Sequence, residues 1–127
     1  MLLADTGVLI AQFRNFDPKR AALIAAQPVG LCGPVLAEFL AGARAAKHQA
    51  ACQVILASLT PVATPEAVWD LAGRNQALLA NNGLNVPLID TIIASVAIVT
   101  GLKLWAYDTH FAAMAALLAG LRMFQEP

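Results

Sequence analysis

The chain has 127 residues, of which 59% are hydrophobic and only 13% are charged, and its formal net charge at pH 7 is zero. This length suits a single domain with its own hydrophobic core, and we expect residues 1–127 to form one. A neutral chain has no broad, non-specific attraction for nucleic acid, so any nucleic-acid site must be local.

Short apolar runs alternate with helical patterns along the chain. In order, the pattern predicts a strand over 1–4 entering a loop at Asp5, a helix over 20–26, a strand over 29–32, helices from 34 towards 46 and over 49–57, an extended piece at 59–62, helices over 64–80 and 90–100, a strand over 103–107, a helix over 111–119 and a last strand over 121–124. Thr64 and Pro65 are typical of a helix start, and Gly83 and Gly101 of helix ends. This alternation predicts an α/β fold, a three-layer α/β/α sandwich around a short parallel sheet.

The hydrophobic surplus indicates either a membrane span or a covered protein surface. The longest uncharged run, between Lys47 and Glu66, contains polar residues and prolines, whereas a span needs roughly 20 predominantly apolar residues. An acidic residue, Asp5, stands near the start of the chain, where a signal peptide has basic residues followed by a longer apolar segment. Cys32 and Cys52 have neither metal-site nor redox spacing and are interpreted as buried free thiols. We therefore expect a cytoplasmic protein, without a membrane partner, whose apolar surface is covered by a second copy or another protein.

Four of the eight acidic residues have apolar sequence neighbours. They are Asp5, Glu38, Asp90 and Asp108. An isolated ionised carboxylate is costly in apolar surroundings, but a cluster is tolerated when Mg²⁺ or Mn²⁺ neutralises it. Asp5 and Asp108 follow predicted strands and Asp90 begins a predicted helix, so these side chains are able to converge at the carboxyl edge of a parallel sheet.

Each acid also has a purely structural interpretation. Asp90 and Asp108 are suited to capping their helices, and Asp5 to a turn. Glu38 has no basic residue within four positions with which to pair along a helix. One shared metal site explains all four acids together. The remaining acids are interpreted as solvated or capping: Asp17, Glu66, Asp70 and Glu126.

Four segments around the clustered acids follow one another with a spacing that covers nearly the whole chain. They are Leu3-Ala4-Asp5-Thr6-Gly7-Val8-Leu9-Ile10, Pro34-Val35-Leu36-Ala37-Glu38-Phe39-Leu40-Ala41-Gly42, Val86-Pro87-Leu88-Ile89-Asp90-Thr91-Ile92-Ile93-Ala94-Ser95-Val96-Ala97 and Leu104-Trp105-Ala106-Tyr107-Asp108-Thr109-His110-Phe111. In this order they resemble the motifs of the PIN-domain family, especially the VapC-type toxin ribonucleases of toxin–antitoxin systems.

The resemblance implies a metal-dependent endoribonuclease with a PIN-like fold. The family's acids map onto Asp5, Glu38, Asp90 and Asp108 as catalytic, metal-binding residues, with Glu38 a direct ligand or one that acts through water. Divalent ions held there lower the pKa of a bound water and offset the charge of the scissile phosphate. The resemblance also implies Mg²⁺ or Mn²⁺ as cofactor, an RNA substrate, a homodimer and an antitoxin partner.

Thr6, Arg14 and His110 are candidates for substrate binding. The Thr6 hydroxyl is able to hydrogen-bond a carboxylate or a ligand water, or to serve only as a turn hydroxyl. His110 is suited to contacting phosphate or to capping a helix. Arg14, like Arg44 and Lys47, is a candidate for contact with the RNA backbone or an ordinary solvated residue.

Ala106 departs from the family pattern. PIN domains often carry Thr or Ser two residues before the last acid, so a hydroxyl that would orient water or metal is missing here. This departure leaves open, as an alternative, a catalytically inactive PIN-fold module that binds RNA or protein, although the four retained acids argue against it.

Two other enzyme classes share the first motif. Asp5-Thr6-Gly7 also resembles the signature of a retroviral-type aspartic protease subunit, but that fold is nearly all β and this chain has helical patterning. A haloacid-dehalogenase-like phosphatase normally has a second Asp two positions after the first, where this chain has Gly7.

Overall fold

Four short strands form one parallel sheet in the computed structural model, which describes all of residues 1–127. The elements in chain order are β1 (Leu2–Ala4), α1 (Thr6–Arg14), α2 (Pro18–Ala26), β2 (Val29–Cys32), α3 (Gly33–Ala41), α4 (Ala46–Leu56), β3 (Thr60–Val62), α5 (Ala67–Asn81), α6 (Leu88–Thr100), β4 (Lys103–Trp105) and α7 (Thr109–Leu117). The strand order is β3-β2-β1-β4. The α/β class and the parallel sheet predicted from the sequence are confirmed.

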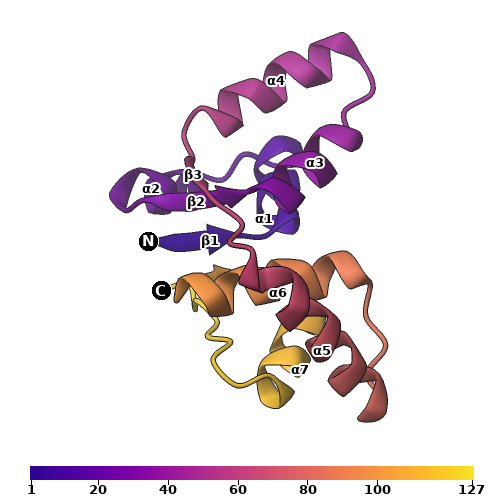
Figure 1. Cartoon of the computed structure of the whole chain (residues 1–127). Coiled ribbons are helices and arrows are strands. Elements are labelled where there is room, and N and C mark those ends of the chain that lie inside the picture. The colour runs from indigo at the N-terminus through magenta and orange to yellow at the C-terminus, as the bar shows by residue number, and fades with distance from the viewer.

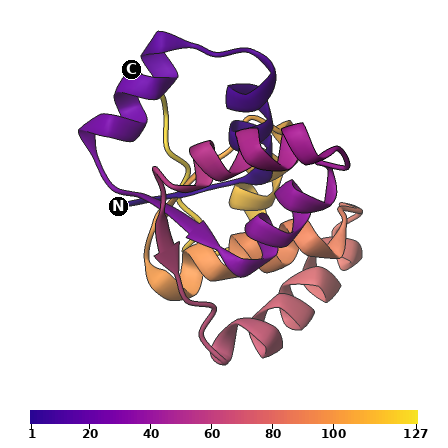
Figure 2. The same cartoon turned by 90° about the horizontal axis from the view of Figure 1, so that it is seen from above.

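Helices lie on both sides of the sheet (Figure 1). Helix α1 packs against α3 and α4, and these three lie above β1 in Figure 1. Helices α5 and α6 pack against each other on the lower side, where α7 also lies. Figure 2, which looks from above, shows the C-terminal segment running up beside α2. The three-layer arrangement expected from the alternation of strands and helices is therefore present.

The sheet lies at the centre of one hydrophobic core. Leu3 and Ala4 of β1 are fully buried, because a central parallel strand is covered on both faces. Helix α6 contributes a continuous buried stretch that includes Ile93 and Val96. Cys32 and Cys52 are buried free thiols, as predicted. Among the helices, none has both the length and the apolar character that crossing a membrane requires.

The structure corrects the sequence-based prediction in four places. Residues 6–14 form helix α1 where a loop was expected, because the Asp5 side chain caps the helix by accepting a hydrogen bond from the Gly7 N–H at 3.3 Å. Helix α3 ends at Ala41 rather than continuing to residue 46. Helix α5 begins at Ala67 without a side-chain cap, so Thr64 does not start it. Residues 121–124 form no strand, only an isolated parallel bridge to β4.

Gly30 allows β1, β2 and β3 to approach closely, and its replacement tests this packing. A Cβ atom at residue 30 would lie 2.5 Å from Val62 Cγ2 and 3.0 Å from the Leu2 carbonyl oxygen. We expect Gly30→Ala to lower the free energy of unfolding by about 1–3 kcal/mol, since overpacking forces the backbone apart. Gly73, in α5, has open space around its Cα, so Gly73→Ala should raise stability by roughly 0.5–1 kcal/mol. Urea denaturation measures both, and equal effects would contradict the close approach at Gly30.

Candidate active site

Asp5 occupies the point where β1 gives way to α1. Its backbone N–H donates to the Trp105 carbonyl at 2.9 Å, so the ends of β1 and β4 lie side by side. The residue is only 5% exposed. Burial raises the pKa of its carboxyl to about 6, against the opposing hydrogen bonds from the Gly7 and Thr6 N–H groups, and the charges of Asp90 and Glu38 raise it further. The ionised Asp5 carboxylate therefore lowers the stability of the fold that holds it in place.

Glu38 reaches the same region from α3, the helix that follows β2. The Thr6 hydroxyl donates to Glu38 Oε1 at 2.5 Å, so the first turn of α1 orients this carboxylate. Glu38 is exposed, contrary to the apolar surroundings expected from its sequence neighbours. The reason is helical geometry: neighbours in sequence are about 100° apart around the axis, so Val35 and Phe39 enter the core while Glu38 does not.

Asp90 lies in the first turn of α6 without capping it. Pro87 is the N-cap residue, and no side chain makes a capping hydrogen bond there. The capping interpretation of Asp90 is therefore wrong. Burial raises the pKa of Asp90, and the charges of Glu38 and Asp108 raise it further, while His110 opposes them. Asp90 thus stands among carboxylates without a hydrogen-bond donor of its own.

Asp108 begins α7 and accepts the His110 N–H at 2.9 Å, so the capping interpretation is correct for this residue. His110 Nδ1 lies 3.4 Å from Asp108 Oδ1 and 3.9 Å from Asp90 Oδ2. One ligand atom from each of Asp90, Asp108 and His110 lies within 4.8 Å of the other two. His110 therefore belongs to the acidic cluster rather than to a distant part of the surface.

The structure thus brings all four sequence-selected carboxylates to one end of the sheet. Thr6, next to Asp5, donates a hydrogen bond to Glu38, and Asp90 and Asp108 both lie beside His110. The charges of these acids accordingly add to the effect of burial on the pKa values of Asp5 and Asp90. Apart from His110, no cationic side chain lies within 4.0 Å of their oxygens, since the one other ion pair joins Asp70 to Arg74. Uncompensated carboxylates, one of them buried, fit a hard divalent cation with oxygen ligands.

The remaining candidates lie around this cluster. Arg14 lines a small cavity of about 90 Å³ together with Glu38 and His48, which places it at the rim of the site. Arg44 and Lys47 are exposed and form no ion pair. One contact was missed: Glu126, which we interpreted as solvated or capping, accepts hydrogen bonds from Trp105 and Tyr107 next to Asp108. Glu126 lies 19 and 21 positions from its two donors and belongs to none of the four motifs, so tertiary structure alone reveals this contact.

Comparison with known proteins identifies the family. The model of the PIN domain matches residues 2–117. The chain belongs to the PIN-domain family. Ribonuclease VapC32 of Mycobacterium tuberculosis is 34% identical over 119 residues, which cover 91% of each chain.

Solved structures with the same fold include complexes of PIN-domain proteins. VapBC2 from Rickettsia felis, bound to a DNA fragment from its promoter, superposes with a TM-score of 0.84 at 17% identity, covering 97% of this chain and 96% of that one. VapBC-5 of the VapBC family of toxin–antitoxin systems, from Mycobacterium tuberculosis, superposes with a TM-score of 0.73 at 26% identity, covering 98% and 97%. PIN-domain nucleases are metal-dependent, and the acidic cluster of this PIN domain suits that dependence.

The raised pKa of Asp5 predicts how stability depends on pH. The folded-state pKa of about 6 lies above the ordinary value of 3.8, so the folded state binds more protons and metal-free stability falls as pH rises from about 4 to 6. Asp5→Asn removes this charge and keeps a good helix cap. We expect the variant to be more stable than wild type by roughly 1–3 kcal/mol at pH 7 without metal, and nearly equal to it at pH 4.

Urea denaturation at pH 4 and pH 7 measures this difference. Saturating Mn²⁺ at pH 7 should stabilise wild type, because the bound ion neutralises the negative charge of Asp5. The ion should have much less effect on Asp5→Asn, which lacks this charge. If wild type and Asp5→Asn differed in stability by the same amount at pH 4 and pH 7, the charge of Asp5 would not be the cause of the difference.

Proposed function

We propose that this PIN domain hydrolyses RNA at the carboxylates of Asp5, Glu38, Asp90 and Asp108, with Mg²⁺ or Mn²⁺ bound between them. The chain is a ribonuclease of the VapC type by its family and by its likeness to VapC32 over 91% of its length. One observation carries the assignment of the site: Asp90, Asp108 and His110 offer ligand atoms within 4.8 Å of one another, and no Lys or Arg pairs with these acids. Asp5 and Glu38 interact by charge with Asp90 of the same group. Mg²⁺ and Mn²⁺ are the cations whose ligand preferences match this set of oxygens.

Each residue has a distinct part in the proposed mechanism. When bound, the cation supplies a water of lowered pKa and offsets the charge of the scissile phosphate. Burial, together with the charges of neighbouring carboxylates, raises the pKa values of Asp5 and Asp90, so a cation held by these residues would stabilise their ionised forms. Thr6 holds Glu38 in place through its hydroxyl. His110, beside Asp108 and Asp90, is placed to contact a phosphate oxygen.

Cleavage assays with Asp90→Asn test this proposal. Asp90 caps nothing and has no hydrogen-bond donor, so the amide should preserve the fold while it removes a negative charge. We expect divalent-metal-dependent cleavage of RNA by wild type and a loss of at least about 100-fold in the variant, in line with the removal of a metal ligand. Asp70→Asn is the matched control, because Asp70 is an exposed partner of Arg74 away from the cluster.

A wild-type protein that binds RNA without cleaving it would favour the alternative of an inactive PIN-fold module, which Ala106 alone suggests. Cleavage by Asp90→Asn at the wild-type rate would refute the assignment of the carboxylate site.

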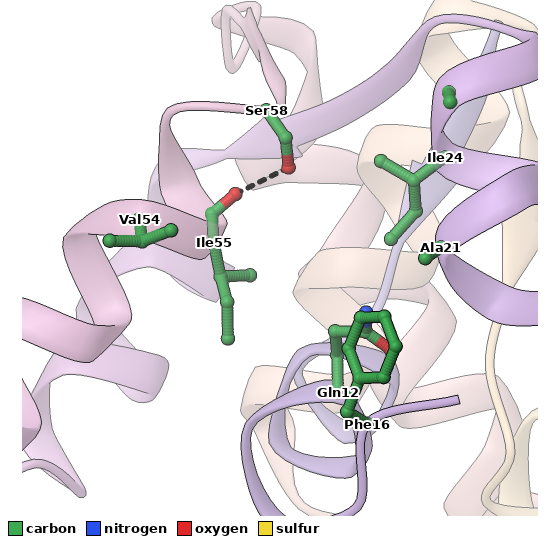
Figure 3. A pocket seen from close by; sticks show the side chains of 8 residues that line it. Gln12, Phe16, Ala21, Ile24, Val54, Ile55 and Ser58 are labelled. Carbon is green, nitrogen blue, oxygen red and sulfur yellow. Dashed lines mark hydrogen bonds between the residues drawn. The ribbon is translucent and has the colours of Figure 1, made fainter. Parts of the chain in front are cut away.

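We further propose that an antitoxin covers an apolar groove between α2 and α4 (Figure 3). The groove has a volume of about 550 Å³, and six of its eight lining residues are hydrophobic. Phe16 and Val54, which line it, are 70% and 75% exposed, an unusual exposure for such side chains. Figure 3 shows Val54 and Ile55 of α4 on one side of the groove and Ile24 of α2 on the other. The solved VapBC complexes are toxin–antitoxin assemblies, so an antitoxin segment with an apolar face is the occupant we propose.

A different apolar surface supports a homodimer. Trp69 and Leu78 of α5 and Leu88 of α6 are exposed, and these two helices pack against each other on the side of the molecule away from α4 (Figure 1). Large exposed apolar side chains are candidates for burial in an interface, and a second copy is the partner we propose. A cytoplasmic location, where thiols stay reduced, fits the two free cysteines.

Light scattering with the proposed antitoxin partner tests both surfaces at once. Wild type should have the mass of a dimer alone and a larger mass with antitoxin. Val54→Asp places a charge in the groove, so we expect antitoxin binding to weaken by at least about 100-fold because the carboxylate loses its hydration. The dimer should persist, since Val54 lies on the opposite side from α5. Gln53→Asp, an exposed neighbour on α4 that does not line the groove, is the matched control.

Equal antitoxin affinity of the Val54→Asp and Gln53→Asp variants would exclude the groove as the docking site. A monomeric mass for wild type would exclude the proposed dimer without bearing on the groove.

A further inference from the structure

Residues 122–126 run along the outer edge of the sheet and reach α2 (Figure 2). Leu104 of β4 donates its N–H to the Arg122 carbonyl and accepts the Phe124 N–H, both at 2.8 Å. The Phe124 ring meets Trp105 edge to face, with centroids 5.7 Å apart. This pairing aligns the segment with β4, the strand that leads directly to Asp108.

Glu126 completes the alignment with its side chain. Its Oε1 atom accepts hydrogen bonds from Trp105 Nε1 at 2.9 Å and from the Tyr107 hydroxyl at 2.5 Å. Trp105 and Tyr107 flank Ala106, and Tyr107 is the residue immediately before Asp108. The carboxylate of Glu126 thus joins both ends of the connection between β4 and the acidic cluster.

Arg20 holds Tyr107 from the other side. Its Nε atom donates to the Tyr107 hydroxyl at 3.0 Å, and its guanidinium carbon lies 5.6 Å from the ring centroid. The same guanidinium donates to Gln12 Oε1 at 2.9 Å and to the Asn15 carbonyl at 3.0 Å, which ties it to α1. The hydroxyl of Tyr107 therefore connects α2 with residues 122–126.

Packing alone does not account for this arrangement. Trp105 is buried, so its Nε1–H needs an acceptor, which an apolar residue at position 126 would not supply. Instead, an exposed carboxylate satisfies two donors that come from the residues on either side of Ala106. Ala106 itself has no hydroxyl with which to order the connection, so its geometry depends on its two neighbours.

We propose that Glu126 is a positioning residue for Asp108: by holding Trp105 and Tyr107 it fixes the connection from which Asp108 reaches the bound cation. This inference rests on the proposed metal site. Residues that orient ligands in this indirect way typically contribute 10–100-fold to metal affinity or activity. The expected contribution here is near the lower end, because Asp108 is also fixed by its own capping hydrogen bond.

The test compares Glu126→Ala and Glu126→Gln with Glu66→Ala, a control acid that is exposed and forms no ion pair. Three quantities are measured: amide hydrogen exchange of residues 106–110 without metal, the Kd for Mn²⁺ alone, and kcat and KM for RNA cleavage. We expect Glu126→Ala to accelerate exchange, to weaken Mn²⁺ binding by about tenfold and to lower kcat similarly with little change in KM. Glu126→Gln, whose amide oxygen still accepts hydrogen bonds, should remain within about threefold of wild type.

Wild-type values of exchange, Kd and kcat in Glu126→Ala would overturn the inference, as would equal losses in Glu126→Ala and Glu126→Gln. Asp108→Asn, assayed alongside, separates this result from a failure of the proposed function. If Asp108→Asn loses activity while Glu126→Ala does not, only the role of Glu126 is refuted. If Asp108→Asn binds Mn²⁺ and cleaves RNA as wild type does, both the proposed metal site and the role of Glu126 are refuted.

Discussion

Loss of hydration, added to repulsion between neighbouring carboxylates at the carboxyl end of a parallel sheet, is the constraint on which the rest of this structure depends. Asp5 is buried, and its pKa is raised to about 6. The pKa of Asp90 is raised by the same two causes, loss of hydration and neighbouring negative charge. Such a cluster destabilises the fold at neutral pH unless a cation compensates it. Stability and function therefore oppose each other here: the hydrophobic core supplies the free energy that keeps these acids together until a cation binds.

Local hydrogen bonds hold three of the four acids in place. Asp5 and Asp108 each cap a helix while they face the cluster, and Thr6 in the first turn of α1 donates to Glu38. Capping and metal binding do not compete, because a carboxylate has several lone pairs on two oxygens. Residues that have a sufficient structural explanation are thus also available for chemistry, and the two interpretations of Asp5 and Asp108 are compatible.

The site is enclosed by surfaces with different chemistry. The apolar groove between α2 and α4 is separated from the acidic cluster, yet Arg20 of α2 reaches Tyr107, next to Asp108. A protein bound in the groove therefore contacts a helix that is linked by two hydrogen bonds, through Tyr107, to Glu126. This arrangement explains why the composition is rich in apolar residues although the site itself is polar: the apolar surplus forms the core and the surfaces around the site.

The sequence by itself determined the class of the fold and the four acids. Strands and helices follow from local patterns of apolar residues, and Asp5, Glu38, Asp90 and Asp108 stand in motifs whose order resembles that of the PIN-domain family. Local reasoning failed where two interpretations fit the same residues, as at Asp5, which suggested a loop but caps α1, and at Asp90, which suggested a cap but forms none. Only the tertiary structure decided that Glu38 is exposed, that His110 joins the cluster and that Glu126 holds Trp105 and Tyr107. The physical reason is that helix and strand formation depend on residues within a few positions, whereas burial, charge coupling and these hydrogen bonds depend on how distant segments pack.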